Sequence, residues 1–579
     1  MAVYTIADQG ESVFHIVNNQ YCDETVRFAA SELQKYLLKA TNAAIPYYSD
    51  RCPMRGPEIR VGANVRGETG VPEGIHEEGF YIRGEGEHIT ITAPTSRGVL
   101  YGVYRFLEIF CNFRCFTKDV ETIDTFETLT IQLDEIQESP EFDFREAYFR
   151  NAFDGDFCAK SHFNSSLADI SKAKGGRMKW YNFHHSFADL VSPEFYFEEH
   201  PEYFSLIDGE RVADSQLCLT NPEVAEVAEK TLRRWIAENP ECTVFSVAQN
   251  DNYRRCTCPN CMALEEKEGS PSGPVIHFVN CLADAIREEY PQVLLHTFAY
   301  KHTVPAPRNV IARDNVIVRL CSFSCNFHKP LTILAEENPA GPEAEFVGAF
   351  RDWKTHASQI YIWDYAVNYH NYLQPFFQFH TMAENIRYFK ANGARGLLEQ
   401  GNFAYGGGAA MDDLKAYLIC RLLWNVDADV DAEMDRFFTA VYGEKAALYM
   451  KEYVRIFEEA PKEDGLFIKQ YPNTAWVTDG LVAQGEALFE KALAAAENDT
   501  FRQRIAREQL AVRYLRLVRL PLDAPGREIA IDQFFNDVKS FGITEIMERN
   551  SLAFSRECMK KSQYTLDRAG KYKLYYIMQ

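Results

Sequence analysis

The feature that most constrains the fold of this sequence is an alternation of short strand-like runs and amphipathic helical segments between residues 140 and 425. Parallel strands need long crossover connections that usually contain a helix, so this alternation predicts a parallel sheet. One helical segment begins at Pro222 and carries Val224, Ala228 and Leu232 on a single apolar stripe. Eight runs have the length and composition of strands: residues 144–150, 180–183, 216–219, 243–247, 294–299, 316–320, 360–363 and 396–399.

Eight strands with intervening helices predict a (β/α)8 TIM-type barrel of the α/β class. An open doubly wound sheet is the alternative, but no glycine-rich phosphate-binding loop follows any of the strand-like runs. Residues 1–135 predict a small N-terminal α/β domain, because they contain their own strand-like and helical segments. Residues 430–579 lack strand patterns and predict a helical C-terminal domain. We therefore expect three domains, with the barrel at residues 140–425 in the middle.

The composition excludes several classes of protein. With 579 residues, of which 46% are hydrophobic and 13% aromatic, the chain can form several packed cores. Its formal net charge of -22 and the lack of a basic cluster argue against a nucleic-acid partner, whose phosphates require dense positive charge. No stretch has the length of a membrane span, and the first residues lack a secretory signal, so we expect a cytoplasmic protein without a membrane partner. A homo-oligomer is compatible with the sequence.

Three carboxylates fall at the ends of predicted strands: Asp251, Asp364 and Glu399. In a barrel, the loops after the carboxyl ends of the strands build the active site. Cleavage of a glycosidic bond needs such a convergence, with one carboxyl group as acid and another as base, nucleophile or charge partner. Each of the three could alternatively cap a helix. We expect Asp251 to be the general acid/base, Glu399 its partner and Asp364 the third candidate.

Amide, aromatic and imidazole side chains accompany these acids and are suited to sugar hydroxyls and to the apolar faces of sugar rings. Aromatic residues are more often part of a core, but here they alternate with polar groups. No metal-binding histidine pair is present, so we expect no cofactor for catalysis. The predicted substrate-binding residues are Gln249, Asn250, His184, His185, Tyr300, Trp363, Tyr365 and Gln400.

Two further motifs have alternative interpretations. Cys256, Cys258 and Cys261 have a spacing that lets three thiolates bind one ion, with Cys158, Cys281 or Cys325 as the fourth ligand. A structural zinc ion and ordinary free thiols are both consistent with this spacing. The glycine triplet at residues 406–408 lacks the Lys-Ser/Thr of a phosphate-binding loop and predicts a hinge or a close-packed turn.

Several runs in fixed order resemble the DUF4838 family, which includes the endo-β-N-acetylglucosaminidases of glycoside hydrolase family 163. The resemblance covers roughly residues 140–425. The N-terminal unit is similar to the small domain that precedes the barrel in α-glucuronidases and β-hexosaminidases. The runs are His185-Ser-Phe, Tyr196-Phe-Glu-Glu-His200-Pro-Glu-Tyr-Phe-Ser205-Leu, Gln216-Leu-Cys-Leu-Thr-Asn-Pro222, Ser246-Val-Ala-Gln-Asn-Asp251 and Trp363-Asp-Tyr-Ala-Val-Asn-Tyr.

The resemblance implies a glycoside hydrolase that acts on a β-linked glycan containing an (N-acetyl)hexosamine. The similarity to N-acetylhexosaminidases implies substrate-assisted retention, in which the acetamido oxygen attacks the anomeric carbon. Those enzymes carry two adjacent acids where this chain has Asn250 and Asp251. An α-glucuronidase-like scheme would instead use an acid near the fourth strand with Asp364 and Glu399 around a water, giving inversion. A glycan-binding protein without turnover is the alternative from another class.

Overall fold

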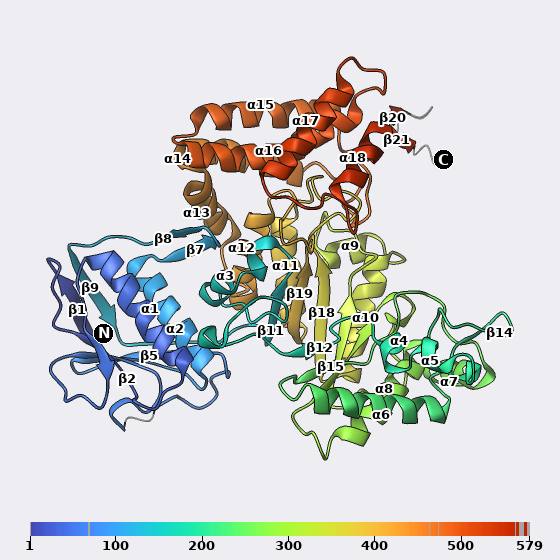
Figure 1. Cartoon of the computed structure of the whole chain (residues 1–579), viewed down its shortest axis with the longest axis horizontal. Helices are drawn as coiled ribbons and strands as arrows, with labels where there is room; N and C mark the ends of the chain where they lie inside the picture. The colour runs from blue at the N-terminus through green and yellow to red at the C-terminus, as the bar shows by residue number, and fades with distance from the viewer. Residues whose placement is uncertain are drawn as a thin grey trace.

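The computed structural model describes residues 2–67, 70–462, 464–472, 474–561, 563–566 and 572–575. Figure 1 shows an N-terminal α/β part beside a central sheet with its helices, and a group of C-terminal helices beyond one end of that sheet. These three parts follow one another along the chain.

The N-terminal part is built on a six-stranded mixed sheet. Helices α1 (Glu24–Thr41) and α2 (Ser96–Cys111) pack against each other and bury their apolar faces. Each begins at a side-chain cap, because Asp23 accepts from the Val26 amide and Thr95 accepts from the Gly98 amide. The strand order is β10 (Glu135–Glu138), β5 (Phe80–Glu85), β6 (His88–Thr92), β4 (Glu58–Val61), β2 (His15–Asn18) and β3 (Tyr47–Ser49). Two further antiparallel pairs join β1 (Ala2–Asp8) to β9 (Thr128–Leu133) and β7 (Arg114–Thr117) to β8 (Val120–Thr122).

A buried ion pair joins the N-terminal part to the central sheet. Nη2 of Arg145 lies 2.5 Å from Oε2 of Glu78, and both side chains are buried. Arg97 also pairs with Glu78. Nearby, the ring of Phe80 stacks on Trp424 with centroids 5.9 Å apart. These contacts fix the first strand of the central sheet against the N-terminal part.

The central sheet has seven strands, and all of its neighbouring strands are parallel. The sheet curls strongly, so that the ring of Phe144 on one edge strand lies 5.3 Å from the ring of Trp180 on the other edge strand. The strand order is β11 (Phe144–Ala147), β19 (Ala394–Gln400), β18 (Gln359–Tyr365), β17 (Val316–Cys321), β16 (Leu294–Ala299), β15 (Val244–Ser246) and β12 (Trp180–Tyr181). The connections contain α3 (Gly155–Lys160), α6 (Pro222–Glu238), α7 (Pro259–Glu268), α8 (Ser272–Ile286), α9 (Leu331–Glu337), α10 (Pro342–His356) and α11 (Phe379–Ala391), and α12 (Asp412–Trp424) follows the last strand. The predicted fold class, an α/β barrel-type sheet with helices, is confirmed.

The predicted strand at residues 216–219 is wrong. In the part of the chain that the structure describes, this run makes a single isolated bridge between Leu217 and Phe204. It lies in an irregular insertion between β12 and α6 that contains α4 (Phe187–Leu190), α5 (Pro193–Tyr196) and the hairpin of β13 (Leu206–Ile207) and β14 (Glu210–Arg211). A run of four residues, of which three are apolar, is too short for periodicity to distinguish a strand from a buried loop.

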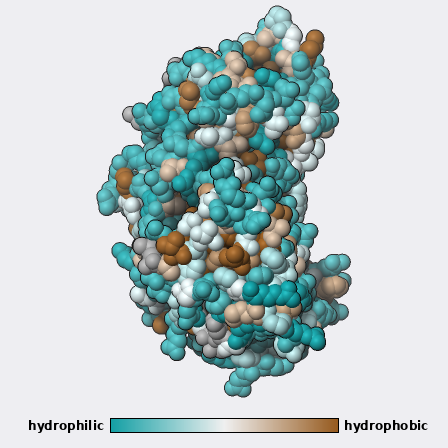
Figure 2. Space-filling model, turned by 90° about the vertical axis from the view of Figure 1, so that its left-hand side faces the viewer, coloured by the Kyte–Doolittle hydropathy of each residue, from teal (hydrophilic) through white to brown (hydrophobic). Residues whose placement is uncertain are grey.

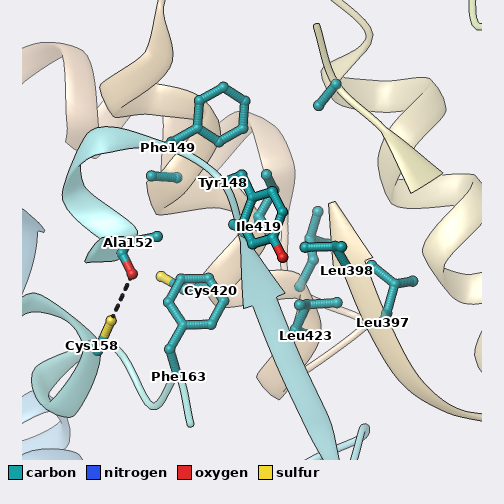
Figure 3. Close-up of a cluster of buried hydrophobic side chains, with 14 of the residues drawn as sticks. Tyr148, Phe149, Ala152, Cys158, Phe163, Leu397, Leu398, Ile419, Cys420 and Leu423 are labelled. Atoms are coloured by element: carbon teal, nitrogen blue, oxygen red, sulfur yellow. Dashed lines mark hydrogen bonds between the residues drawn. The ribbon is translucent and has the colours of Figure 1, made fainter. Parts of the chain in front are cut away.

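Side chains fill the interior of the curled sheet. The Arg319 guanidinium carbon lies 4.4 Å from the Phe183 ring centroid and 4.5 Å from that of Trp180. Arg319 is fully buried, and burial lowers its pKa to about 10. Outside the sheet, Leu397 lies in a cluster of buried side chains that also includes Ile419 and Leu423 of α12 (Figure 3). The sheet is therefore packed on both faces by these side chains, and a cavity opens at its carboxyl end.

The C-terminal part consists mainly of helices, as predicted, and ends with one unpredicted antiparallel strand pair. On the face seen in Figure 2, hydrophobic residues form small separate areas within a hydrophilic surface. Among the described residues, no helix is long and apolar enough to cross a membrane. The elements are α13 (Val430–Tyr442), α14 (Glu444–Glu458), α15 (Asp479–Ala495), α16 (Asp499–Arg519), α17 (Arg527–Ser540), α18 (Leu552–Lys561), β20 (Gln563–Leu566) and β21 (Tyr572–Tyr575).

The segment between α17 and α18 returns to the carboxyl end of the central sheet. The Tyr372 amide donates to the carbonyl of Ile546 at 2.9 Å, and the Glu548 amide donates to the carbonyl of Tyr369 at 3.1 Å. The glycine triplet packs against the same segment, since a Cβ at Gly408 would lie 2.3 Å from the carbonyl oxygen of Glu545. The triplet is therefore a close-packed turn, one of the two predicted alternatives.

Substitution of Gly408 by Ala should destabilise the protein by about 3 kcal/mol, because it combines a positive φ of 131° with a backbone clash. Calorimetry should show a lower Tm, and hydrogen exchange should become faster in residues 542–548. Gly74→Ala is the matched control, since Gly74 also has a positive φ but no atom within 4 Å of the added Cβ. Equal effects of the two substitutions would contradict the role assigned to close packing.

Candidate active site

One cavity of about 650 Å³ opens at the carboxyl ends of the central strands. Its wall combines residues at or just after the carboxyl ends of all seven strands with Lys469 and with Glu545, Glu548 and Arg549 from the segment between α17 and α18. The lining residues are Tyr148, His184, His185, Asp251, Phe298, Tyr300, Lys301, Cys321, Phe323, Trp363, Tyr365, Tyr369, Tyr372, Gln400, Asn402, Phe403, Lys469, Glu545, Glu548 and Arg549. The structure thus brings seven predicted site residues together here: Asp251, His184, His185, Tyr300, Trp363, Tyr365 and Gln400.

Asp364 and Glu399 do not line this cavity, which corrects the predicted convergence of three acids. Both side chains are completely buried, and the two residues are direct partners in the pairing of β18 and β19. Side chains alternate between the faces of a strand, so the orientation of Trp363 and Tyr365 towards the cavity turns Asp364 away from it. The same alternation turns Glu399 away, because Gln400 faces the cavity.

Asp364 and Glu399 form a buried acid pair on the face of the strands that points away from the cavity, and the pKa values of both are raised. The Ser322 hydroxyl donates to Oδ1 of Asp364, but burial dominates and raises the pKa of Asp364 to about 6. Burial and the neighbouring charge of Asp364 raise the pKa of Glu399 well above its ordinary value. Neither acid lines the cavity, and burial together with their mutual repulsion disfavours the ionisation of both at once.

The predicted substrate ligands Gln249 and Asn250 also point elsewhere. Gln249 is buried, and its Nε2 donates to Oγ1 of Thr303 at 2.7 Å. Asn250 donates from Nδ2 to the carbonyl of Ser215 at 2.7 Å and accepts from the amide of Ala188 at 3.1 Å. Both side-chain amides are bound to groups of neighbouring segments, as buried polar groups generally are.

Asp251 reaches the cavity from the loop after β15 and accepts hydrogen bonds from two residues that follow β16. Nζ of Lys301 lies 2.6 Å and the Tyr300 hydroxyl 3.2 Å from Oδ1 of Asp251. Partial burial acts to raise the pKa of Asp251, but the bond from Lys301 and the nearby His185 outweigh it and lower the pKa. Asp251 is therefore ionised at neutral pH, which suits a charge partner or base better than the predicted general acid.

Glu548 lines the same cavity, and its pKa is shifted in the opposite direction to that of Asp251. Burial raises its pKa, with further contributions from the charges of Asp251 and Glu545, against the lowering effect of Arg549 and Lys469. Glu545 also lines the cavity, and burial alone raises its pKa. Asp251 and Glu548 line the same cavity, and the negative charge of Asp251 contributes to the raised pKa of Glu548. Sequence patterns gave no indication of Glu548, because it lies in the part predicted to be helical.

The two histidines are neutral and differ in their partners. Nδ1 of His185 bonds the carbonyl oxygen of Gln249, which makes Nε2 the acceptor of the neutral ring, and Nε2 lies 3.8 Å from Oδ1 of Asp251. Burial is the largest cause that lowers the pKa of His185. For His184, burial and the charge of Arg319 lower the pKa to about 4. Both imidazoles can exchange hydrogen bonds with hydroxyl groups without carrying charge.

Trp363, Phe298 and Tyr148 form an aromatic part of the cavity wall, which we call the floor. The indole Nε1 of Trp363 donates to Oε1 of Gln400 at 2.6 Å, which fixes the orientation of both side chains. The Trp363 ring meets those of Phe298 and Tyr148 edge to face, with centroids 5.7 and 6.3 Å apart. A rigid apolar surface beside amide and imidazole groups is suited to a ligand with an apolar face and a ring of hydroxyls.

Three residues of the cavity wall have strained backbone conformations. Lys301, Phe403 and Arg549 have positive φ angles of 55°, 41° and 57°, and all three line the cavity. Residues other than glycine rarely adopt this region and persist there only where the surroundings require it, typically at functional sites. Lys301 could have been predicted, because it comes directly after a predicted strand.

The three cysteines of the Cys-x-Cys-x-x-Cys motif gather with a fourth that the sequence did not predict. Cys218, Cys256, Cys258 and Cys261 place their Sγ atoms within 4.8 Å of one another. None of the predicted fourth ligands lies there. Cys158 donates to the carbonyl of Ala152 inside the hydrophobic cluster of Figure 3, Cys325 contacts the carbonyl of Pro342, and Cys281 is exposed on α8. Cys218 was missed because its run was predicted to be a strand of the sheet.

Among solved structures, the fold is similar to that of a family 115 4-O-methyl-α-glucuronidase with specificity for decorated arabinogalactans. That match has a TM-score of 0.58 and 11% identity, and it covers 96% of this chain and 78% of the other. A family 20 β-N-acetylhexosaminidase from Streptomyces coelicolor matches with a TM-score of 0.43 and 14% identity over 76% of this chain and 92% of that one.

Comparison with curated protein sequences gives no match. Residues 7–106 match the family model described as the N-terminus of glycosyl hydrolase family 67. Residues 115–455, more than half of the chain, match the model described as a domain of unknown function, DUF4838. The chain therefore belongs to the DUF4838 family.

Proposed function

We propose that this protein is a glycoside hydrolase that cleaves its substrate by acid/base catalysis in the cavity at the carboxyl ends of the strands. One observation carries the proposal. The cavity holds two carboxyl groups whose pKa values are shifted in opposite directions, Glu548 upwards and Asp251 downwards. Environments that separate two such pKa values identify a proton donor and its ionised partner.

In this scheme Glu548 protonates the leaving oxygen, and Asp251 stabilises the positive charge that develops at the anomeric carbon. Trp363 and the other floor aromatics would support the apolar face of the sugar. Nε2 of His185 would accept from a sugar hydroxyl. The match of residues 7–106 to a glycosyl hydrolase N-terminus supports the reaction class.

For the substrate we propose a β-linked glycan that contains an N-acetylhexosamine, following the resemblance of residues 140–425 to the family 163 enzymes. An ionised Asp251 is suited to accept the N–H of a 2-acetamido group. That contact would direct the acetamido oxygen to the anomeric carbon and give retention of configuration.

A uronic acid is the second candidate substrate. Lys469 and Arg549 line the cavity and offer positive charge to a sugar carboxylate. The family 115 structure with a similar fold is described as an α-glucuronidase. In this case a water would attack the anomeric carbon, with Asp251 as its base, and the configuration would invert.

A panel of aryl glycosides and oligosaccharides tests these proposals. We expect release of product from β-N-acetylhexosaminides, with retained configuration seen by proton NMR immediately after cleavage. Preference for α-glucuronides with inversion would select the second candidate. Binding of glycans without turnover by any substrate of the panel would contradict the hydrolase proposal and identify a glycan-binding protein.

A further inference from the structure

A compact cluster of four cysteines lies beneath the loop that carries Asp251. The Sγ atom of Cys218 lies 3.7 Å from that of Cys258 and 4.0 Å from that of Cys261, and all four Sγ atoms lie within 4.8 Å of one another. Zinc–sulfur bonds of about 2.3 Å in a tetrahedron place the sulfur atoms roughly 3.8 Å apart. A disulfide would need about 2.05 Å. The sulfur spacing therefore matches that of a tetrahedral metal site.

The cluster is separate from the main hydrophobic core. All four cysteines are buried, and among the described residues the partly buried Leu206 is the hydrophobic side chain that packs against them. The other buried cysteines of the described chain belong to the extended core. Four sulfur atoms brought together from an insertion, a loop and the first turn of α7 form a set of soft ligands of the kind that selects zinc.

Donors surround the sulfur atoms as they do in thiolate metal sites. The Leu206 amide donates to Cys256 at 3.3 Å, and the Cys261 amide donates to Cys258 at 3.5 Å. The Thr220 hydroxyl lies 3.1 Å from the Sγ atom of Cys261. These contacts would orient the ligands and offset the negative charge that four thiolates bring to one divalent ion.

Positive charge is also supplied by a side chain. Nη1 of Arg211 lies 4.0 Å from the Sγ atom of Cys256, and the same nitrogen donates to the carbonyl of Phe204 at 2.7 Å. Arg211 is thus anchored next to the sulfur atoms. A guanidinium in this position would stabilise a doubly negative metal–tetrathiolate group and would gain little from four neutral thiols.

We propose that Cys218, Cys256, Cys258 and Cys261 bind one zinc ion in a closed tetrahedral site. Four thiolates leave no open coordination position, so the ion would have a structural role and no part in the chemistry of the cavity. Its binding free energy would add to the stability of the folded state.

The site would fix the position of the Asp251 loop. Two residues before Cys218, Gln216 donates from Nε2 to the carbonyl of Asn250 at 2.8 Å and accepts from the amide of Asn250 at 2.8 Å. Cys256 and Cys258 hold the other end of the same loop. A metal that links Cys218 to Cys256 and Cys258 would therefore clamp both sides of the segment that presents Asp251.

Elemental analysis of the purified full-length protein tests the proposal. We expect about one zinc per chain for the wild type, and less than roughly a tenth of that for Cys218→Ser and for Cys258→Ser. Cys281→Ser is the matched control and should keep its zinc, because Cys281 is exposed on α8 and outside the cluster. Chelation should also lower the Tm of the wild type and leave that of Cys218→Ser unchanged.

Cobalt replacement gives a readout that does not depend on the folding of the variants. Wild-type protein reconstituted with Co²⁺ should show thiolate-to-cobalt charge transfer in the near ultraviolet and the strong visible bands of a tetrahedral site. Absence of both zinc and the cobalt spectrum from folded protein supplied with metal would overturn the proposal. Full zinc content in Cys258→Ser, bound iron in place of zinc, or a disulfide within the cluster by mass spectrometry would also overturn it. None of these readouts depends on hydrolase activity.

Discussion

Replacement of Glu548 by Gln is expected to lower kcat by about 10² to 10⁴ on substrates with a poor leaving group, because the amide cannot supply a proton to the departing oxygen. The loss should be much smaller on a dinitrophenyl glycoside, whose leaving group departs without protonation. Burial and neighbouring carboxylates raise the pKa of Glu548, so the wild type should lose activity as the pH rises through that raised value. The variant should lack this alkaline limb of the pH profile.

Glu545→Gln is the matched comparison, since Glu545 lines the same cavity and comes from the same segment. Its pKa is raised by burial alone, without an effect of Asp251, so we expect a smaller loss that is similar for good and poor leaving groups. If the loss in Glu545→Gln depended strongly on the leaving group and the loss in Glu548→Gln did not, Glu545 and not Glu548 would be the general acid.

The fold could be predicted largely because the sequence repeats a strong local signal. Alternation of strands and helices identified seven strands of the curled sheet, and the connecting helices followed from their apolar stripes. The predicted eighth strand failed where the signal was weakest, in the four-residue run at 216–219, which has only three apolar residues. That error also concealed Cys218, since a residue assigned to the sheet was not considered as a ligand of the three downstream cysteines.

The site could be predicted only in part, and one error was avoidable. Successive residues of a strand face opposite sides, so Asp364 could not share a cavity with both Trp363 and Tyr365. The same rule separates Glu399 from Gln400. Glu548 is a different case, because only the tertiary contacts of residues 546–548 with Tyr369 and Tyr372 bring it to the sheet. No local sequence pattern predicts that residues 546–548 pack against these two tyrosines.

Asp251→Asn is expected to reduce kcat by about 10² to 10⁴ with little change in Tm, since it removes the charge that stabilises the transition state and keeps the shape of the side chain. The Asp251 side chain is about half exposed, at 52%, so its replacement should disturb packing little. Steady-state kinetics on a cleaved glycoside and calorimetry together check this expectation. Wild-type kcat in a folded variant would remove Asp251 from the mechanism.

The ion pair between Lys301 and Asp251 predicts how the activity should change at low pH. Lys301 lowers the pKa of Asp251, so the wild type should keep the ionised carboxylate, and its activity, down to pH values below the ordinary range of Asp. In Lys301→Met the pKa of Asp251 should rise, and the acid limb of kcat/KM should move to higher pH. Asp251→Asn should have no such limb. An acid limb that stayed in place in Lys301→Met would show that another group sets it, and the ionised state assigned to Asp251 would then lose its kinetic support.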